Sequence, residues 1–91
     1  YAISFDLSVA SLEQHYTGNN YQNAYGALEV LAGHGFNRQQ GSVYFGDSKV
    51  DAVKTVMAVN SMSREFTWLK DCVSDIRMLR IEENNDLTPA L

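Results

Sequence analysis

Apolar and polar side chains alternate over the first residues of the chain. Tyr1, Ile3 and Phe5 stand at odd positions and alternate with Ala2, Ser4 and Asp6. A period of two in residues that favour β-structure is typical of a strand with one apolar face. We therefore expect a strand here, with Asp6 near its end and directed to the face opposite the apolar one.

A second pattern begins near Tyr21, where apolar residues recur at intervals of three and four. This spacing predicts an amphipathic helix. Asn19 or Asn20 is the expected N-cap, and Gly33 and Gly35 are the expected stops. The apolar positions of this helix are Tyr21, Ala24, Tyr25, Leu28, Leu31 and Ala32.

Two short extended segments follow, residues 36–40 and 42–45, with Gly41 between them. A glycine between two such segments predicts a hairpin or a bulged turn. Alternation along the second segment predicts a core face with Val43 and Phe45, and an opposite face with Ser42 and Tyr44.

A second helix is expected after Gly46. Ser48, followed three residues later by Asp51, approximates a capping box, and the helix should run to about Ser61 or Met62. Residues 66–73 are apolar but few, so we expect one helical turn there, leading into the last strand. The apolar stripe of the second helix comprises Val50, Val53, Val56, Met57 and Val59.

The last apolar segment, residues 73–83, alternates imperfectly. Asp75 and Arg77 share one predicted face, and Ile76 and Met78 share the other. The resulting order of strand, helix, strand, strand, helix, strand is the ferredoxin-like arrangement of the α+β class. It predicts a single domain over residues 1–91, with one antiparallel sheet that the helices cover on one face and leave open on the other.

The composition fits one small domain. Of the 91 residues, 45% are hydrophobic, which excludes a disordered chain, and the length is too short for two cores. A chain of this size buries only roughly two-thirds of its unfolded surface, so a homodimer is expected. The net charge of -4 argues against a protein that coats nucleic acid irrespective of sequence, because such proteins carry a basic surface. Local contact with nucleic acid stays open.

Cysteine usage and hydropathy predict a cytoplasmic location. Cys72 is the only cysteine and cannot form an internal disulfide, which fits a reducing compartment. No apolar run reaches the roughly 18 residues of a membrane span, and the first residues lack the pattern of a signal peptide. We expect no membrane partner.

Residues capable of chemistry gather on the expected open face. Asp6, Ser42 and Tyr44 should project from it, and Asp75 could join them. One carboxylate in each chain is too few to hold Mg²⁺ securely, because the ion normally takes one or two carboxylates together with substrate phosphate. Two open faces packed together in a dimer would supply two copies of Asp6. The structural alternative is that Asp6 only ends its strand and caps a turn.

Other candidates carry competing structural explanations. The two histidines have the residue type for acid-base cleavage of RNA, with His15 expected in a polar loop and His34 at a helix C-terminus, where the helix dipole favours an imidazolium. Arg77 could contact phosphate, or it could pair with acids at a sheet edge. Tyr44 could stack on a base or line a dimer contact. Cys72 is expected in the core.

Four separated segments carry a resemblance that extends over nearly the whole chain. They are YAISFDL at 1–7, GHGF at 33–36, QQGSVY at 39–44 and DIRMLRIE at 75–82. In this order they resemble virulence-associated protein D, the VapD family. That family is similar in turn to the small CRISPR-associated protein two, which has a ferredoxin-like fold and an open-face dimer. The resemblance implies a bacterial endoribonuclease that acts as the toxin of a toxin-antitoxin pair, in some bacteria beside a small antitoxin called VapX.

The resemblance also implies roles for particular residues. The family's strand-end aspartate corresponds to Asp6, its hairpin serine to Ser42, and its acidic residue before an Ile-Arg pair to Asp75. We expect cleavage of RNA at the cleft of a homodimer, where Asp6 binds a metal or orients the attacking oxygen and Ser42 positions a phosphate. Tyr44 and Arg77 are the expected substrate contacts. Mg²⁺ is the candidate ion, and the resemblance leaves open whether any metal is required.

Two other classes of function remain open at this point. A non-catalytic dimeric scaffold that binds nucleic acid would need a continuous basic stripe, which the scattered basic residues do not provide. A small-molecule regulatory domain is compatible with the fold, since fold alone does not determine function. The absence of a glycine-rich ligand loop from the sequence makes this last class less favoured.

Overall fold

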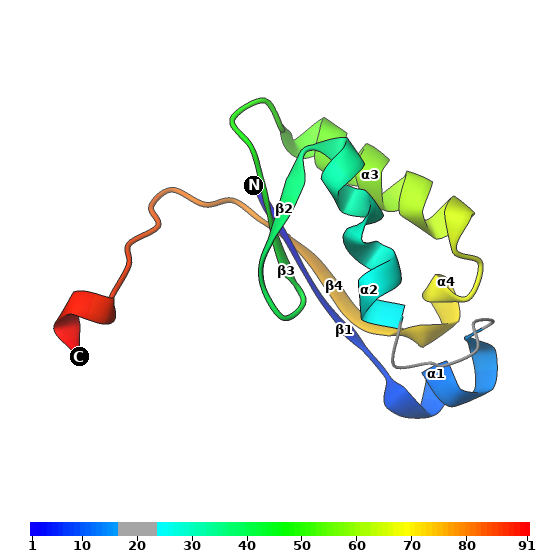
Figure 1. Ribbon diagram of the computed structural model, residues 1–91. Coiled ribbons are helices and arrows are strands. Elements are labelled where there is room, and N and C mark those ends of the chain that lie inside the picture. The colour runs from blue at the N-terminus through cyan, green and yellow to red at the C-terminus, as the bar shows by residue number, and fades with distance from the viewer. Residues whose placement is uncertain (17–23) are drawn as a thin grey trace.

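The strands form one antiparallel sheet in the computed structural model, which describes residues 1–16 and 24–91 (Figure 1). Their order across the sheet is β2-β3-β1-β4, and each neighbouring pair is antiparallel. The predicted α+β class with an antiparallel sheet is confirmed, and the strand order is consistent with a ferredoxin-like arrangement. The strands are β1 (Ala2–Leu7), β2 (Phe36–Gln40), β3 (Val43–Gly46) and β4 (Val73–Leu79).

Helices α2, α3 and α4 lie on one side of the sheet, and the C-terminal residues run away from it after β4 (Figure 1). In the described part of the chain, no helix has the length and apolar character needed to span a membrane. The helical elements are α1 (Val9–His15), α2 (Ala24–Ala27), η2 (Leu28–His34), α3 (Ala52–Glu65), α4 (Leu69–Cys72) and η3 (Thr88–Ala90).

Strand β1 has one face in the core and one face outside it, as its alternating sequence predicts. Ile3, Phe5 and Leu7 belong to the core cluster, whereas Asp6 is exposed. The helices contribute their own apolar side chains to the same core, among them Leu28, Leu31, Ala58 and Met62. The face that carries Asp6 is therefore the one that the helices leave open.

The segment after β1 is helical, whereas the sequence predicts a polar loop for His15. Helix α1 follows Ser8, whose hydroxyl accepts a hydrogen bond from the Ser11 N–H at 3.3 Å. Leu12 is the only residue of α1 that is buried. A helix this short with one buried side chain produces no apolar periodicity in the sequence, which is why the pattern does not predict it. His15 is its last residue.

The next predicted helix is described only from Ala24 onward. Its expected caps, Asn19 and Asn20, and its first apolar position lie outside the described residues. Of the two predicted stops, Gly35 is confirmed: its φ is 87°, and its N–H donates to the carbonyls of Leu31 and Ala32 near the end of η2. Only glycine adopts this left-handed backbone readily. Gly33 is not a stop, because it lies inside η2.

Helix α3 differs from its prediction at both ends and in its buried face. Asp51, not Ser48, is the N-cap, and its side chain accepts from the Lys54 N–H at 2.8 Å. The helix continues to Glu65, past the expected end. Its buried residues are Thr55, Ala58 and Met62. Three members of the predicted stripe are exposed instead, namely Val53, Val56 and Met57.

The predicted hairpin is confirmed, but its faces are exchanged. Ile3 pairs with Tyr44 across β1 and β3, so Tyr44 shares the core face. Val43 and Phe45 therefore project from the open face, where they are partly buried. Alternation shows that Ser42 and Tyr44 share one face and that Val43 and Phe45 share the other, but it does not show which face meets the helices. A tyrosine ring can be buried as readily as a valine or phenylalanine side chain.

Candidate active site

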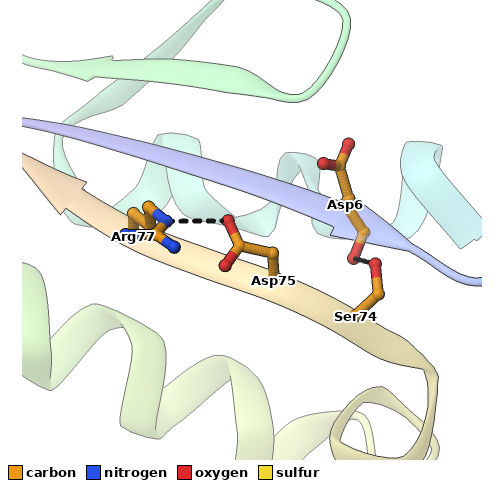
Figure 2. Close-up of polar contacts among 4 residues, drawn as sticks. All are labelled: Asp6, Ser74, Asp75 and Arg77. Atoms are coloured by element: carbon orange, nitrogen blue, oxygen red, sulfur yellow. Dashed lines mark hydrogen bonds and ion pairs between the residues drawn. The ribbon is translucent and has the colours of Figure 1, made fainter.

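Two carboxylates meet on the open face of the sheet. Asp6 of β1 and Asp75 of β4 are register partners in the antiparallel pairing of these strands. Partners in such a pair project from the same face, with Cβ atoms roughly 4.5–5.5 Å apart. Figure 2 shows the two side chains rising from neighbouring strands. The expectation that Asp75 could join Asp6 is thus met within one chain.

A β-bulge at Ser74 sets this arrangement. Asp6 pairs with Asp75 but Leu7 pairs with Val73, which leaves Ser74 as an extra residue. In a regular strand, Val73 and Asp75 would share a face. The bulge instead lets Val73 pack against the core while Asp75 stays beside Asp6 on the open face.

The Ser74 side chain closes the bulge onto β1. Its hydroxyl donates a hydrogen bond to the backbone carbonyl of Asp6 at 3.2 Å (Figure 2). Tyr25 holds the same end of β1 from the helix side, because its hydroxyl accepts from the Leu7 N–H at 3.3 Å. Sequence reasoning assigns neither residue to the site, and no pattern in the sequence marks a bulge.

Arg77 lies beside the carboxylates, as its predicted face requires. Its Nε donates to Oδ2 of Asp75 at 3.0 Å, and it pairs with Ser4 in the register (Figure 2). The side chains of Arg77 and Asp75 are 70% and 45% exposed. An ion pair this exposed adds only about 0–1 kcal/mol to stability, so the guanidinium is available to an anion.

The sequence predicts Ser42 on the open face with Asp6, and the structure does not place it there. It is in the turn before β3, where its carbonyl accepts from the Phe5 N–H at 3.2 Å. Since Ser4 pairs with Val43, Ser42 continues the register opposite Phe5, a core residue. It stays one residue from Asp6 along β1, at the end of the hairpin.

The predicted place of Tyr44 on the open face is wrong. The residue is 2% exposed, and its ring stacks on Phe5 with centroids 5.9 Å apart. Burial raises the pKa of the Tyr44 hydroxyl, an effect that Arg38 opposes and Glu29 reinforces. A side chain inside the core cannot stack on a base at the surface.

The two histidines and the cysteine lie apart from the carboxylate pair. Within the described residues, no hydrogen bond or ion pair joins His15 or His34 to the two carboxylates; His34 ends η2, as expected for a helix C-terminus. Cys72 is buried in the core as predicted, and burial, assisted by Asp71, raises the pKa of its thiol. A thiol of this kind is a poor nucleophile.

The Asp6–Asp75 pair matches Mg²⁺ in ligand type but does not form a complete metal site. Across residues 1–16 and 24–91 there is no group of three or more His, Cys, Asp or Glu side chains that could hold a metal ion. Mg²⁺ is usually held by one or two carboxylates, with waters and substrate phosphates completing the octahedron. The two aspartates supply that number.

Comparison with known proteins places the chain among relatives of similar length, although no family model matches it. It is 48% identical to endoribonuclease VapD 2 of Riemerella anatipestifer over all of this chain and 98% of that protein. It is 42% identical to an endoribonuclease VapD homolog of Helicobacter pylori, again over all of this chain and 95% of the relative. An endoribonuclease VapD of Dichelobacter nodosus is 40% identical, over 97% of this chain and 92% of its own. The chain therefore belongs to the VapD endoribonuclease family.

Proposed function

We propose that this protein cleaves RNA as an endoribonuclease and that Asp6 and Asp75 are its catalytic carboxylates. The observation that carries the proposal is their direct opposition across β1 and β4 on the open face. Relatives that match the chain over nearly its full length are named endoribonucleases, which supports the reaction class.

The chemistry that suits this site is attack by an RNA hydroxyl under general-base catalysis. The 2′-hydroxyl gives its proton to the base as its oxygen bonds to phosphorus, and the bond from phosphorus to the 5′-oxygen breaks. The leaving 5′-oxygen takes up a proton from water, and a 2′,3′-cyclic phosphate remains. Asp6 is exposed and is assigned as the base that accepts the 2′-hydroxyl proton. Asp75, fixed by Arg77, is assigned to orient the attacking oxygen or a water beside it.

The substrate brings negative charge to two carboxylates, so the site needs a positive partner. Arg77 forms an ion pair with Asp75, and we assign its guanidinium to a phosphate oxygen. Ser42 remains a proposed phosphate contact at the end of the hairpin. Tyr44 is no longer part of the proposed site.

Mg²⁺ is a proposed cofactor. The ion would be held by Asp6 and Asp75, and when bound it would reduce repulsion between the carboxylates and the phosphate. Whether cleavage needs it is tested by chelation.

We further propose that the protein works as a homodimer joined through its open face. That face is apolar at the end away from the aspartates, where Ala2 lies between Phe45 and Leu79 in the register. Leu79 is 43% exposed in the single chain. A second copy would cover these side chains and bring a second Asp6–Asp75 pair to the same cleft.

The wider role we propose is that of a cytoplasmic toxin held in check by a small protein antitoxin. The VapD family resemblance of the sequence supports this role. Expression of the chain alone should arrest bacterial growth, and the Asp6→Asn variant should not.

The purified protein is incubated with labelled RNA, with and without chelator, beside Asp6→Asn and Asp71→Asn. Asp71 is an exposed acid on α4 and serves as the matched control. We expect internal cleavage that Asp6→Asn abolishes and Asp71→Asn retains. RNA that is bound but left intact by the wild type would point to a non-catalytic scaffold instead.

A further inference from the structure

Strand β4 has one unpaired edge. Among the described strands it lies at the end of the sheet and pairs only with β1. The Phe5 N–H donates a hydrogen bond to the Ser42 carbonyl on the β3 side. The backbone N–H and C=O groups of the odd residues of β1 therefore point toward β3, and those of the even residues point toward β4. By the same alternation, the backbone groups of Ile76 and Met78 point away from β1, toward the free edge.

The side chains of the same two residues line a groove beneath α3. Ile76 and Met78 lie on the helix side of the sheet but remain 37% and 45% exposed. The groove has a volume of about 170 Å³ and is lined mainly by Ile3, Val56, Val59, Ile76 and Met78. A second hollow of about 220 Å³ also has Val59 and Ile76 in its lining, and we call the two hollows together the channel between α3 and β4.

Helix α3 exposes several apolar side chains, of which Val56 lines this channel. Val53, Val56 and Met57 are 67%, 52% and 60% exposed, and Val56 and Met57 follow Val53 by three and four residues, on the same side of the helix. Together with Ile76 and Met78, they make up five of the nine large hydrophobic side chains that the described residues expose. Apolar surface gathered in this way marks an interaction site.

Charge at the channel comes from one basic side chain, on a protein whose net charge is -4. Lys70 lines the second hollow and forms no ion pair with any described residue, and no acidic residue of the described chain lines either hollow. Arg77 also contributes to the lining of the first hollow, but its guanidinium pairs with Asp75 on the open face. An occupant that carries acidic side chains is therefore electrostatically favoured over a neutral or basic one.

We propose that the channel between α3 and β4 is a docking site for an extended, acidic segment of another protein, which adds a strand to the free edge of β4. Main-chain hydrogen bonds to Ile76 and Met78 supply the pairing, and alternate apolar side chains of the segment pack against Val56 and Val59. The site is formed by the edge of β4 and the helix side of the sheet, so it does not depend on the RNA-cleaving face.

The test uses a labelled seven-residue peptide, the length of β4, in which valine alternates with glutamate. Hydrogen exchange and fluorescence anisotropy are measured on the full-length protein, on Val56→Glu and on Val9→Glu. Val9 is the matched control because it is a valine of similar exposure, 56%, at the start of α1. We expect the peptide to slow exchange at the Ile76 and Met78 amides, and Val56→Glu alone to weaken binding by about tenfold or more.

Four results would overturn the proposal. The first is an unchanged exchange rate at the Ile76 and Met78 amides when the peptide is added, and the second is an equal loss of peptide binding in Val9→Glu. The third is equally tight binding of a peptide that carries lysine in place of glutamate. The fourth is protection of the two amides without peptide, increasing with the concentration of the protein. The last result would identify a second copy of this chain as the occupant.

Discussion

Asp6 and Asp75 face each other across two hydrogen-bonded strands, with only Arg77 among the described residues forming an ion pair with either of them. Like charges directly opposite in an antiparallel pair are destabilising. The fold alone would be better served by a neutral or oppositely charged pair at this position. An arrangement that costs stability is typical of a site kept for its chemistry.

The first prediction concerns stability and activity together. Asp6→Asn removes the like-charge repulsion with Asp75, so the free energy of unfolding should rise by a few tenths of a kcal/mol, roughly the size of a cross-strand pair effect. RNA cleavage should be lost in the same variant. Urea denaturation at low salt measures the first effect, and a fall in stability would contradict our account of the pair.

The second prediction separates a core role for Tyr44 from a substrate role. Tyr44→Phe keeps the ring against Phe5, so it should change stability by about 1 kcal/mol or less and leave RNA affinity unaltered. Tyr44→Ala should cost about 3–5 kcal/mol, because it removes a buried aromatic ring. A folded Tyr44→Phe protein that binds RNA more weakly would show that the hydroxyl reaches substrate.

The third prediction tests Arg77 as a phosphate contact. Arg77→Gln should weaken RNA binding and lower the slope of log affinity against log salt by about 0.7, the value for one phosphate contact on a single strand. Arg80→Gln is the control, because Arg80 is similarly exposed, at 74% against 70%, and pairs with Glu82 beyond the end of β4. Equal changes in both variants would mean that any surface charge suffices.

The fourth prediction compares two glycines of one segment. Gly35→Ala should destabilise the protein by about 1–2 kcal/mol or more, because its φ is 87° and an added Cβ would lie 3.0 Å from Cγ2 of Val50. Gly33→Ala should instead be neutral or stabilising by up to about 1 kcal/mol, since Gly33 lies in η2 with nothing within 4 Å of an added Cβ. Thermal unfolding of both variants checks the difference in sign.

Much of the sheet is predictable because its strands carry simple local signals. The alternation of β1, the glycine between β2 and β3, and the shared face of Asp75 and Arg77 all appear in the structure. Each of these depends on neighbours in the sequence. The position of Asp6 on the open face follows from that alternation alone.

The remaining features depend on contacts between distant segments. The bulge at Ser74 arises where β4 must fit both the core at Val73 and the open face at Asp75, and neither requirement is visible from β4 alone. Tyr44 faces the core because β3 pairs with Ile3. The spacing of apolar residues in α3 predicts that Val53, Val56 and Met57 face the core, but the buried face of that helix uses Thr55 and Ala58.

The most direct test of the central claim is the rate of RNA cleavage by Asp6→Asn, Asp75→Asn and the double variant, each shown to be folded. If the two carboxylates act as one catalytic unit, each single substitution removes most of the activity and the double variant loses little more. Full activity in either single variant, or losses that multiply in the double variant, would contradict the account.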